Sequence, residues 1–349
     1  MDSSEILISI IIPCWNSSKS IVKAVESITS QIAQNYEIII IDDASEDGTW
    51  QVIKQLSRHN KRIKIFKNLI NKGPSAVRNC GIKISRGKYI GFLDSDDYFI
   101  TGFLKTAVES LRFCKADIVK FGILRQIHYG EAIKIKELSS SSFYSDKKEK
   151  IIERAIYLET LPVFGFVTNG FYQSSLLKEN QILFEEDLRF AEDFFFNFEV
   201  LRKCKSFKFM SEIGYCYNRG STSSLSSIEI VDYLEIYLRK IDVFYQIGKE
   251  QNCSADILPS LQKLLIRTIY SGGVRQYSRS KSFGAVKQVI RDVCQKSEVK
   301  QILSHRCKQG PLTFLAILPL LLRFYLIVTI LVVLLEIIKR KAKKVFDLL

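Results

Sequence analysis

The stretch Tyr89-Ile90-Gly91-Phe92-Leu93-Asp94-Ser95-Asp96-Asp97 places a short apolar run directly before a group of carboxylates. The apolar run has the length of a strand that is buried on both faces of a sheet. Ligands of open α/β sheets bind beyond the carboxyl ends of the strands. Carboxylates spaced by one residue can reach a ribose and a hard divalent cation together, and such a cation bridges phosphate oxygens. The stretch therefore predicts a nucleotide or metal site at a sheet edge.

The rest of the first third alternates apolar runs with helical periodicity. Ile6–Ile12, Glu37–Ile41 and Ile63–Phe66 predict further buried strands. The segments between them, 21–28, 49–56 and 75–85, predict helices, the first of them capped by Asn16-Ser17-Ser18. Such alternation is typical of parallel strands covered by helices on both faces. The fold class is α/β, a Rossmann-like mixed sheet flanked by helices.

Two more acidic segments follow the same logic. Asp42 and Asp43 come directly after the second strand and can accept hydrogen bonds from a pyrimidine base or a ribose, although a turn with Asp47 capping the next helix explains them equally. Glu192 and Asp193 open an aromatic helix, where a carboxylate suits a general base and also the helix dipole. Taken singly, these segments leave both alternatives open.

In this order, the segments resemble the family 2 inverting glycosyltransferases, which have the GT-A fold. The resemblance runs from Ser9 to about Leu225, two-thirds of the chain. The segments that carry it are Ile10–Asn16, Ile40–Thr49, Asn71–Gly81, Gly87–Asp97, Glu192-Asp193 and Tyr217–Ser224. Two positions depart from the family pattern, because Trp15 replaces the commoner Tyr and Asn218 stands where Arg is frequent. Neither departure removes a catalytic group.

The resemblance implies a role for each acidic segment. Asp193 is implied as the base that deprotonates the acceptor hydroxyl, and Asp96 as the ligand of Mg²⁺ or Mn²⁺. Trp15 is implied to pack against the base of the donor, and Asp43 to hydrogen-bond it. The full donor site comprises Pro13, Trp15, Asn16, Asp42, Asp43, Gly73, Arg78, Asp94 and Ser95. Secondary candidates are Glu192, Asp97, Arg219, Ser221 and Ser224.

The implied reaction moves a sugar from a nucleotide diphosphate, with UDP expected and dTDP and GDP open, to a hydroxyl of a glycan. A sugar nucleotidyltransferase is an alternative, but Pro13-Cys14-Trp15-Asn16 is not the glycine-rich phosphate loop which that class requires after the first strand. A catalytically silent binding subunit of a membrane glycan-assembly complex is another alternative, and the intact acidic set argues against it. Glycosidases also use two carboxylates but need no nucleotide pocket.

The net charge of +14 demands an anionic partner. We expect no nucleic acid, because zinc-finger spacing, aromatic RNA-binding signatures and a helix-turn-helix pattern are missing. Leu312–Leu335 is apolar apart from Arg323 and is interrupted by Pro319, and Lys339–Lys344 is basic. This pattern predicts attachment to an anionic membrane surface, with a bilayer span, an in-plane helix, a bent hairpin and burial in a homo-oligomer left open. A polyprenyl-diphosphate-linked oligosaccharide, as in bacterial surface-polysaccharide assembly, is the expected acceptor.

The remaining features concern compartment and organisation. The eight cysteines form no CxxC pair, which is typical of reduced thiols. The acidic start Met1–Glu5 lacks the basic beginning of a signal peptide, so we expect the cytoplasmic face of the plasma membrane, with peripheral or monotopic attachment through the C-terminus. Three parts are expected: a catalytic domain over 1–225, a basic helical extension over 226–310 and a hydrophobic, basic-flanked membrane-associating segment over 311–349.

Overall fold

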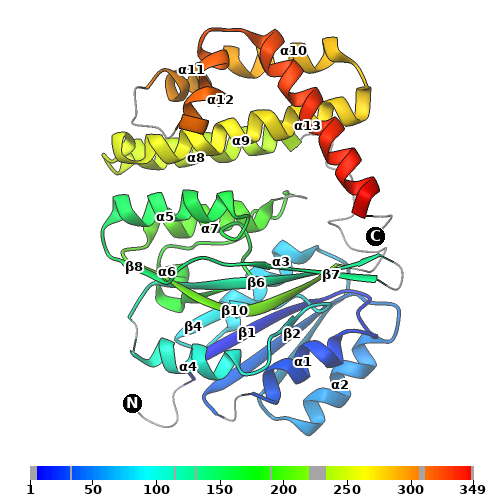
Figure 1. Ribbon diagram of the computed structural model, residues 1–349. Coiled ribbons are helices and arrows are strands. Elements are labelled where there is room, and N and C mark those ends of the chain that lie inside the picture. The colour runs from blue at the N-terminus through cyan, green and yellow to red at the C-terminus, as the bar shows by residue number, and fades with distance from the viewer. Residues whose placement is uncertain are drawn as a thin grey trace. The chain divides into compact units, whose positions relative to one another are not determined.

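The computed structural model describes residues 6–31, 34–113, 115–129, 132–188, 191–219, 233–305 and 311–346. The chain divides into two compact units, Met1–Ile228 and Glu229–Leu349. The first unit holds a mixed sheet with helices on both faces, and the described part of the second unit is helical (Figure 1).

The sheet of the first unit has ten strands in its described part, with the order β3-β2-β1-β4-β9-β6-β10-β5; β7 pairs with β6, and β8 with β10. The strands β1 to β4 run parallel, as predicted, while β9 is antiparallel to both β4 and β6. The bounds are β1 Ile8–Cys14, β2 Tyr36–Asp43, β3 Ile63–Asn68, β4 Tyr89–Phe92, β5 Tyr98–Phe99, β6 Ile118–Tyr129, β7 Ala132–Leu138, β8 Phe143–Ser145, β9 Gly170–Gln173 and β10 Phe207–Arg219.

Helices cover both faces of this sheet, with α1, α2 and α4 on one face and α3, α5, α6 and α7 on the other (Figure 1). Their bounds are α1 Ile21–Thr29, α2 Thr49–His59, α3 Pro74–Ile84, α4 Phe103–Phe113, α5 Lys148–Thr160, α6 Ser174–Glu179 and α7 Glu192–Lys203. Aromatic rings fill the layers between helices and sheet. Phe103 of α4 contacts Phe121 with ring centroids 4.2 Å apart, and Phe196 of α7 stacks on Phe184 at 4.1 Å.

The register of the parallel strands brings the predicted acidic segments to one edge. Cys14 at the end of β1 pairs with Asp42 at the end of β2, and Ile11 pairs with Phe92 at the end of β4. The residues that follow these strands, Trp15 and Asp94 among them, therefore leave the sheet at the same edge. The buried isoleucines of β1 and β2 are explained by their place inside the sheet, where each strand has a neighbour on both sides.

Three local predictions were wrong. Asn16-Ser17-Ser18 does not cap α1; its N-cap is Ser20, and the backbone carbonyl of Ser17 accepts from the amides of Ser20 and Ile21. The polar composition of residues 139–145 predicts a loop, but Phe143–Ser145 forms strand β8, which pairs with β10. Pro319 lies inside α12, and Arg323, with φ 58°, marks the interruption of the tail.

The second unit consists of α8 Tyr233–Glu250, α9 Ser254–Ser280, α10 Phe283–Gln295, α11 Ser297–Ser304, α12 Pro311–Leu321 and α13 Tyr325–Phe346. α13 packs on α9 and α10 through one face, where Val328 and Val332 are buried and Ser278 Oγ donates to Glu336 Oε1 at 2.5 Å. The other face of α13 exposes large apolar side chains: Leu326, Ile327, Ile330, Leu331, Leu334, Leu335, Ile337 and Ile338. Within the described ranges, no helix combines the length and apolarity needed to cross a bilayer.

Candidate active site

The loops that follow β1, β2 and β4 are joined by hydrogen bonds at the carboxyl edge of the sheet. Ser17 Oγ lies 2.6 Å from Ser95 Oγ, which ties the first loop to the acidic stretch after β4. The amide of Asn16 donates to Ser45 Oγ at 2.9 Å, which ties the first loop to the second. Asn16 and Ala44 both adopt positive φ, of 48° and 61°, so these loops turn sharply where the strands end. The loops that carry Asn16, Ser45 and Ser95 are thus hydrogen-bonded to one another.

Asp43 holds the loop before α3. Its carboxylate accepts from the amides of Lys72 and Gly73, at 3.0 and 2.8 Å, and from Asn68 Nδ2 at 2.7 Å. Gly73, with φ 84°, is the N-cap of α3 and precedes Pro74 at the first helical turn. Both oxygens of Asp43 are engaged within the protein, so this residue positions the start of α3. Its contact with a base stays a prediction.

Arg78 of α3 connects three carboxylates. Its Nη2 donates to Asp94 Oδ1 at 2.8 Å, and its Nη1 lies 3.2 Å from Asp193 Oδ1 and 3.5 Å from Glu192 Oε1. The guanidinium is buried and lies over the ring of Phe184. The surrounding carboxylates raise the pKa of Arg78 above its ordinary value despite burial, so the group stays charged. The structure therefore brings Asp94, a predicted donor-site residue, and Asp193, the predicted base, to one cation.

Asp193 lies in the first turn of α7. Oδ2 accepts from the amide of Val167 at 3.3 Å. Burial raises the pKa of this carboxyl to about 7; Arg78 opposes the shift, and the like charges of Glu192 and Asp94 add to it. A carboxyl with this pKa is half ionised near neutral pH, which suits a residue that accepts a proton.

Asp96 and Asp97 have different surroundings. The side chain of Asp96 reaches solvent, and partial burial together with the neighbouring Asp94 raises its pKa to about 6. Asp97 is buried, accepts from Tyr215 Oη and from the amide of Asn218 at 2.7 Å, and its pKa is raised by burial. Asp97 therefore joins the loop after β4 to β10. Among the described residues, no group of three or more His, Cys, Asp or Glu side chains is arranged to hold a metal.

The remaining predicted residues are distributed as follows. Trp15 directly follows β1 and is 57% exposed, while Pro13 pairs with Ile41 inside the sheet. Asp42 is fully buried, and its Oδ1 accepts from the amide of Ser45 at 3.3 Å. Arg219 ends β10, and its side chain, like Ser221 and Ser224, lies outside the described residues.

Sequence reasoning missed a polar group behind Asp193. Asn197 lies one turn after Asp193 on α7, and its Nδ2 donates to the Asp193 carbonyl at 2.9 Å and to the carbonyls of Gly165 and Phe166 at 3.2 Å. Lys120 of β6 is fully buried nearby. The charged residue inside the apolar run Ile118-Val119-Lys120-Phe121 was the signal that could have identified Lys120.

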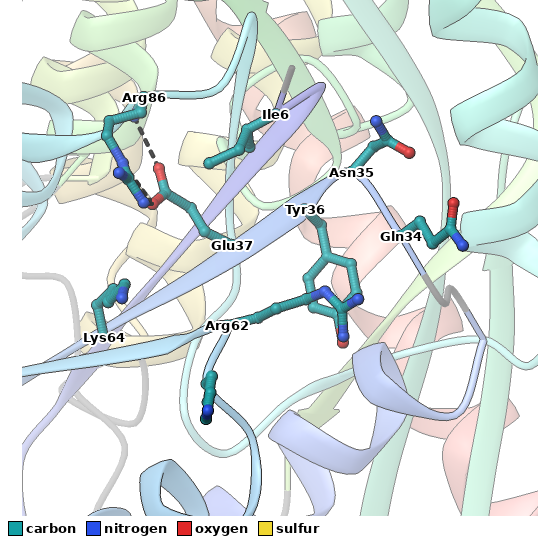
Figure 2. Close-up of a pocket in the computed structure, with 9 residues that line it drawn as sticks. Ile6, Gln34, Asn35, Tyr36, Glu37, Arg62, Lys64 and Arg86 are labelled. Atoms are coloured by element: carbon teal, nitrogen blue, oxygen red, sulfur yellow. Dashed lines mark hydrogen bonds and ion pairs between the residues drawn. The ribbon is translucent and has the colours of Figure 1, made fainter. Parts of the chain in front are cut away.

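A pocket of about 520 Å³ opens at the opposite edge of the sheet. It lies where β1 to β4 begin and is lined by basic side chains, with Arg86 paired to Glu37 at 3.3 Å (Figure 2). Glu37 also accepts from Ser9 Oγ at 2.7 Å, so its carboxylate links Arg86 to strand β1. The pocket holds none of the predicted site residues.

Sequence comparison agrees with this arrangement. Residues 9–176 match the family model described as glycosyl transferase family 2. These residues form a glycosyl transferase family 2 domain. Membership of family 2 is thereby confirmed for this part of the chain, as is the predicted enzyme class, a glycosyltransferase.

Three similar proteins extend the comparison. The uncharacterized glycosyltransferase EpsJ of Bacillus subtilis is 26% identical over 86% of each chain. WfaP of Escherichia coli, a UDP-Glc:alpha-D-GlcNAc-diphosphoundecaprenol beta-1,3-glucosyltransferase, is 36% identical over 40% of this chain and 61% of its own length. The crystal structure of Staphylococcus aureus TarS 1–349 in complex with UDP superposes with a TM-score of 0.65 at 21% identity, over 96% of this chain and 92% of that one. The GT-A fold is thus confirmed.

Proposed function

We propose that this glycosyltransferase moves a sugar from a UDP-sugar to a hydroxyl of a membrane-linked glycan, with inversion at the anomeric carbon. The observation that carries the proposal is the bridge through Arg78, which holds Asp94 and Asp193 to one guanidinium. Direct displacement requires that the donor diphosphate and the acceptor hydroxyl lie next to each other, and Arg78 brings the residues expected to bind them together in this way. The UDP held by the TarS structure supports uracil as the base.

The proposed chemistry uses one proton transfer. Asp193 takes the proton of the acceptor hydroxyl as that oxygen forms a bond to the anomeric carbon. The bond from this carbon to the diphosphate oxygen breaks on the opposite face, and its electron pair leaves with the nucleoside diphosphate. The raised pKa of Asp193, about 7, gives the carboxylate enough basicity for the task while leaving about half of it ionised at neutral pH.

Asp96 is the residue that fits a divalent cation. Its carboxylate reaches solvent and carries a pKa raised to about 6 beside Asp94, so a cation would relieve the like-charge repulsion. One carboxylate ligand suffices where donor phosphate oxygens and water complete the shell of Mg²⁺ or Mn²⁺. The cation supplies charge neutralisation for the leaving diphosphate. Trp15 offers an exposed ring on which a base can stack, at the end of β1.

The second unit supports an acceptor held at a membrane. The exposed apolar face of α13 is followed in sequence by Lys339, Arg340, Lys341, Lys343 and Lys344. An in-plane amphipathic helix with flanking basic residues binds anionic lipid through apolar insertion and charge attraction together. The basic residues favour the cytoplasmic face. WfaP, which acts on a diphosphoundecaprenol-linked sugar, supports a lipid-linked acceptor.

The test is a comparison of Asp193→Asn with Glu192→Gln. Both replacements remove a carboxylate next to Arg78, but only the first removes the proposed base. We expect D193N to lower kcat roughly a hundredfold or more while calorimetry still detects UDP-sugar binding. E192Q should retain most of the rate. Equal activity of D193N and wild type would remove Asp193 from the mechanism.

A further inference from the structure

Lys120 is fully buried in the middle of β6, an environment that lysine rarely occupies. Its Nζ donates to the Phe166 carbonyl at 2.5 Å and to Asn169 Oδ1 at 3.2 Å. The rings of Phe164 and Tyr172 lie beside the ammonium, 5.5 and 5.7 Å from it. Lys120 is therefore hydrogen-bonded to the 163–169 segment, which connects α5 to β9.

This segment also contacts the base. Val167, next to the carbonyl that Lys120 holds, donates its amide to Asp193 Oδ2 at 3.3 Å. Asn169 anchors the segment from its other side, because its Nδ2 donates to the carbonyls of Phe121 and Val163 at 2.8 and 3.1 Å. Lys120 is thus separated from the Asp193 carboxylate by one short piece of hydrogen-bonded backbone.

Asn197 of α7 also hydrogen-bonds both the 163–169 segment and Asp193. Its Nδ2 shares the Phe166 carbonyl with Lys120 and donates to the Asp193 carbonyl, while its Oδ1 accepts from Tyr172 Oη at 2.7 Å. These polar groups are buried, so loss of one partner leaves others unsatisfied in a low-dielectric interior. The orientation of Asp193 therefore depends on the whole group.

Charges of both signs surround Lys120 and Asp193. Burial lowers the pKa of Lys120 to about 7, and the carboxylates of Asp193 and Glu159 oppose the shift. Asp193 in turn faces Arg78 on α3, Asp94 after β4, Glu192 on its own helix and the Tyr172 hydroxyl of β9. A positive charge on Lys120 favours the ionised carboxylate of Asp193.

We propose that Lys120 is a positioning residue for Asp193: it fixes the 163–169 segment so that the Val167 amide meets the carboxylate. The proposal rests on the role of Asp193 in the proposed function. It assigns Lys120 no contact with donor or acceptor.

The experiment compares Lys120→Met and Lys120→Gln with the control Lys148→Met. Lys148 also donates from a partly buried ammonium to backbone carbonyls, those of Leu201, Arg202 and Cys204, but at the other end of α7. For K120M we expect a roughly 10- to 100-fold fall in kcat with UDP-sugar affinity kept within about twofold, because misplacement of the base costs rate rather than donor binding.

The pH dependence of kcat/KM distinguishes a role of Lys120 in positioning Asp193 from a role in fold stability alone. Loss of the Lys120 charge and of the Val167 contact raises the pKa of Asp193, so the acidic limb of kcat/KM should move to higher pH in K120M. K120Q, which keeps a donor towards Phe166, should recover part of kcat and retain the shift. K148M should lower Tm without moving the limb. If K120M does not fold, K120Q still carries the test.

A second measurement does not depend on activity. The native pKa of Lys120 lies below the unfolded value, so the unfolded chain binds more protons between about pH 7 and 10 and stability should rise with pH there. This rise should be absent in K120M. A K120Q pH profile identical to wild type, with D193N inactive, would overturn the role of Lys120 alone. An active D193N would overturn the proposed function, and the role of Lys120 with it.

Discussion

The Asp193 carboxylate lies 3.2 Å from Nη1 of Arg78, although 115 residues separate the two in the chain. The other nitrogen of the same guanidinium meets Asp94 at 2.8 Å. One buried cation therefore joins the strand end that is expected to hold the donor to the helix start that is expected to hold the base. This arrangement makes Arg78 the residue on which the charge balance of the site depends.

Replacing Arg78 with Gln should destabilise the fold and shift the titration of the base. Three carboxylates then face one another without the cation, and loss of one partner of a buried charge group costs about 3–5 kcal/mol. The loss of unfolding free energy should be smaller at pH 5 than at pH 8, because protonation of the carboxylates relieves their mutual repulsion. Denaturant unfolding at the two pH values measures it. Equal destabilisation at both would contradict the charge argument.

The acidic limb of kcat/KM should lie near pH 7 in the wild type. Asp193 has a raised pKa of about 7, and its protonated form cannot accept the acceptor proton, so the rate falls as pH drops through this value. Glu192→Gln removes a like charge and should move the limb to lower pH. Arg78→Gln removes the opposing charge and should move it to higher pH. Shifts in the reverse directions would show that another group controls the limb.

Asp96→Ala should abolish turnover and remove the dependence of donor binding on Mn²⁺. The exposed carboxylate is the one that fits a cation, since Asp97 is engaged by Tyr215 and Asn218. Calorimetry of UDP with and without Mn²⁺ measures the loss. Asp146→Ala, which replaces another exposed aspartate, is the control. Near-wild-type activity of D96A that EDTA still abolishes would place the cation elsewhere.

Much of the fold could be predicted from the sequence because the decisive residues are local. Apolar runs such as Tyr89–Leu93 and Glu37–Ile41 became strands, and the acidic residues after them share one sheet edge. The links between distant segments could not be predicted in the same way. Nothing near Arg78 in sequence indicates that its guanidinium reaches Asp193, and the partners of Lys120 lie 46 to 49 residues away. The engagement of Asp43 by the Lys72 and Gly73 amides is of the same kind.

The tail shows a second limit of sequence reasoning. The apolar composition of Leu312–Leu335 left several arrangements open, because composition does not say which face packs. Packing of Val328 and Val332 towards α9 and α10 assigns one face to the interior and leaves the other exposed. The break at Arg323 depends on a single backbone conformation with positive φ, which neighbouring residues do not signal.

Polar substitution of the exposed face of α13 should release the protein from membranes. The triple variant Ile330→Gln/Leu334→Gln/Ile338→Gln alters only exposed side chains and should keep its Tm. Flotation with vesicles that contain anionic lipid should fall several-fold, because the inserted apolar area is lost. The control Ile133→Gln/Ile135→Gln replaces exposed isoleucines of β7 and should float like the wild type. A variant that forms smaller oligomers and still floats would assign this face to self-association instead.

The most direct test of the central claim is release of nucleoside diphosphate from a panel of sugar donors. Purified full-length protein is incubated with UDP-, GDP- and dTDP-sugars and Mn²⁺, with and without a lipid-linked acceptor, and the freed nucleotide and the anomeric configuration of the product are measured. We expect release from a UDP-sugar that EDTA abolishes, acceleration by the acceptor, and an inverted linkage formed by the wild type and not by D193N. Failure to release nucleotide from any donor, or a product with retained configuration, would contradict the account.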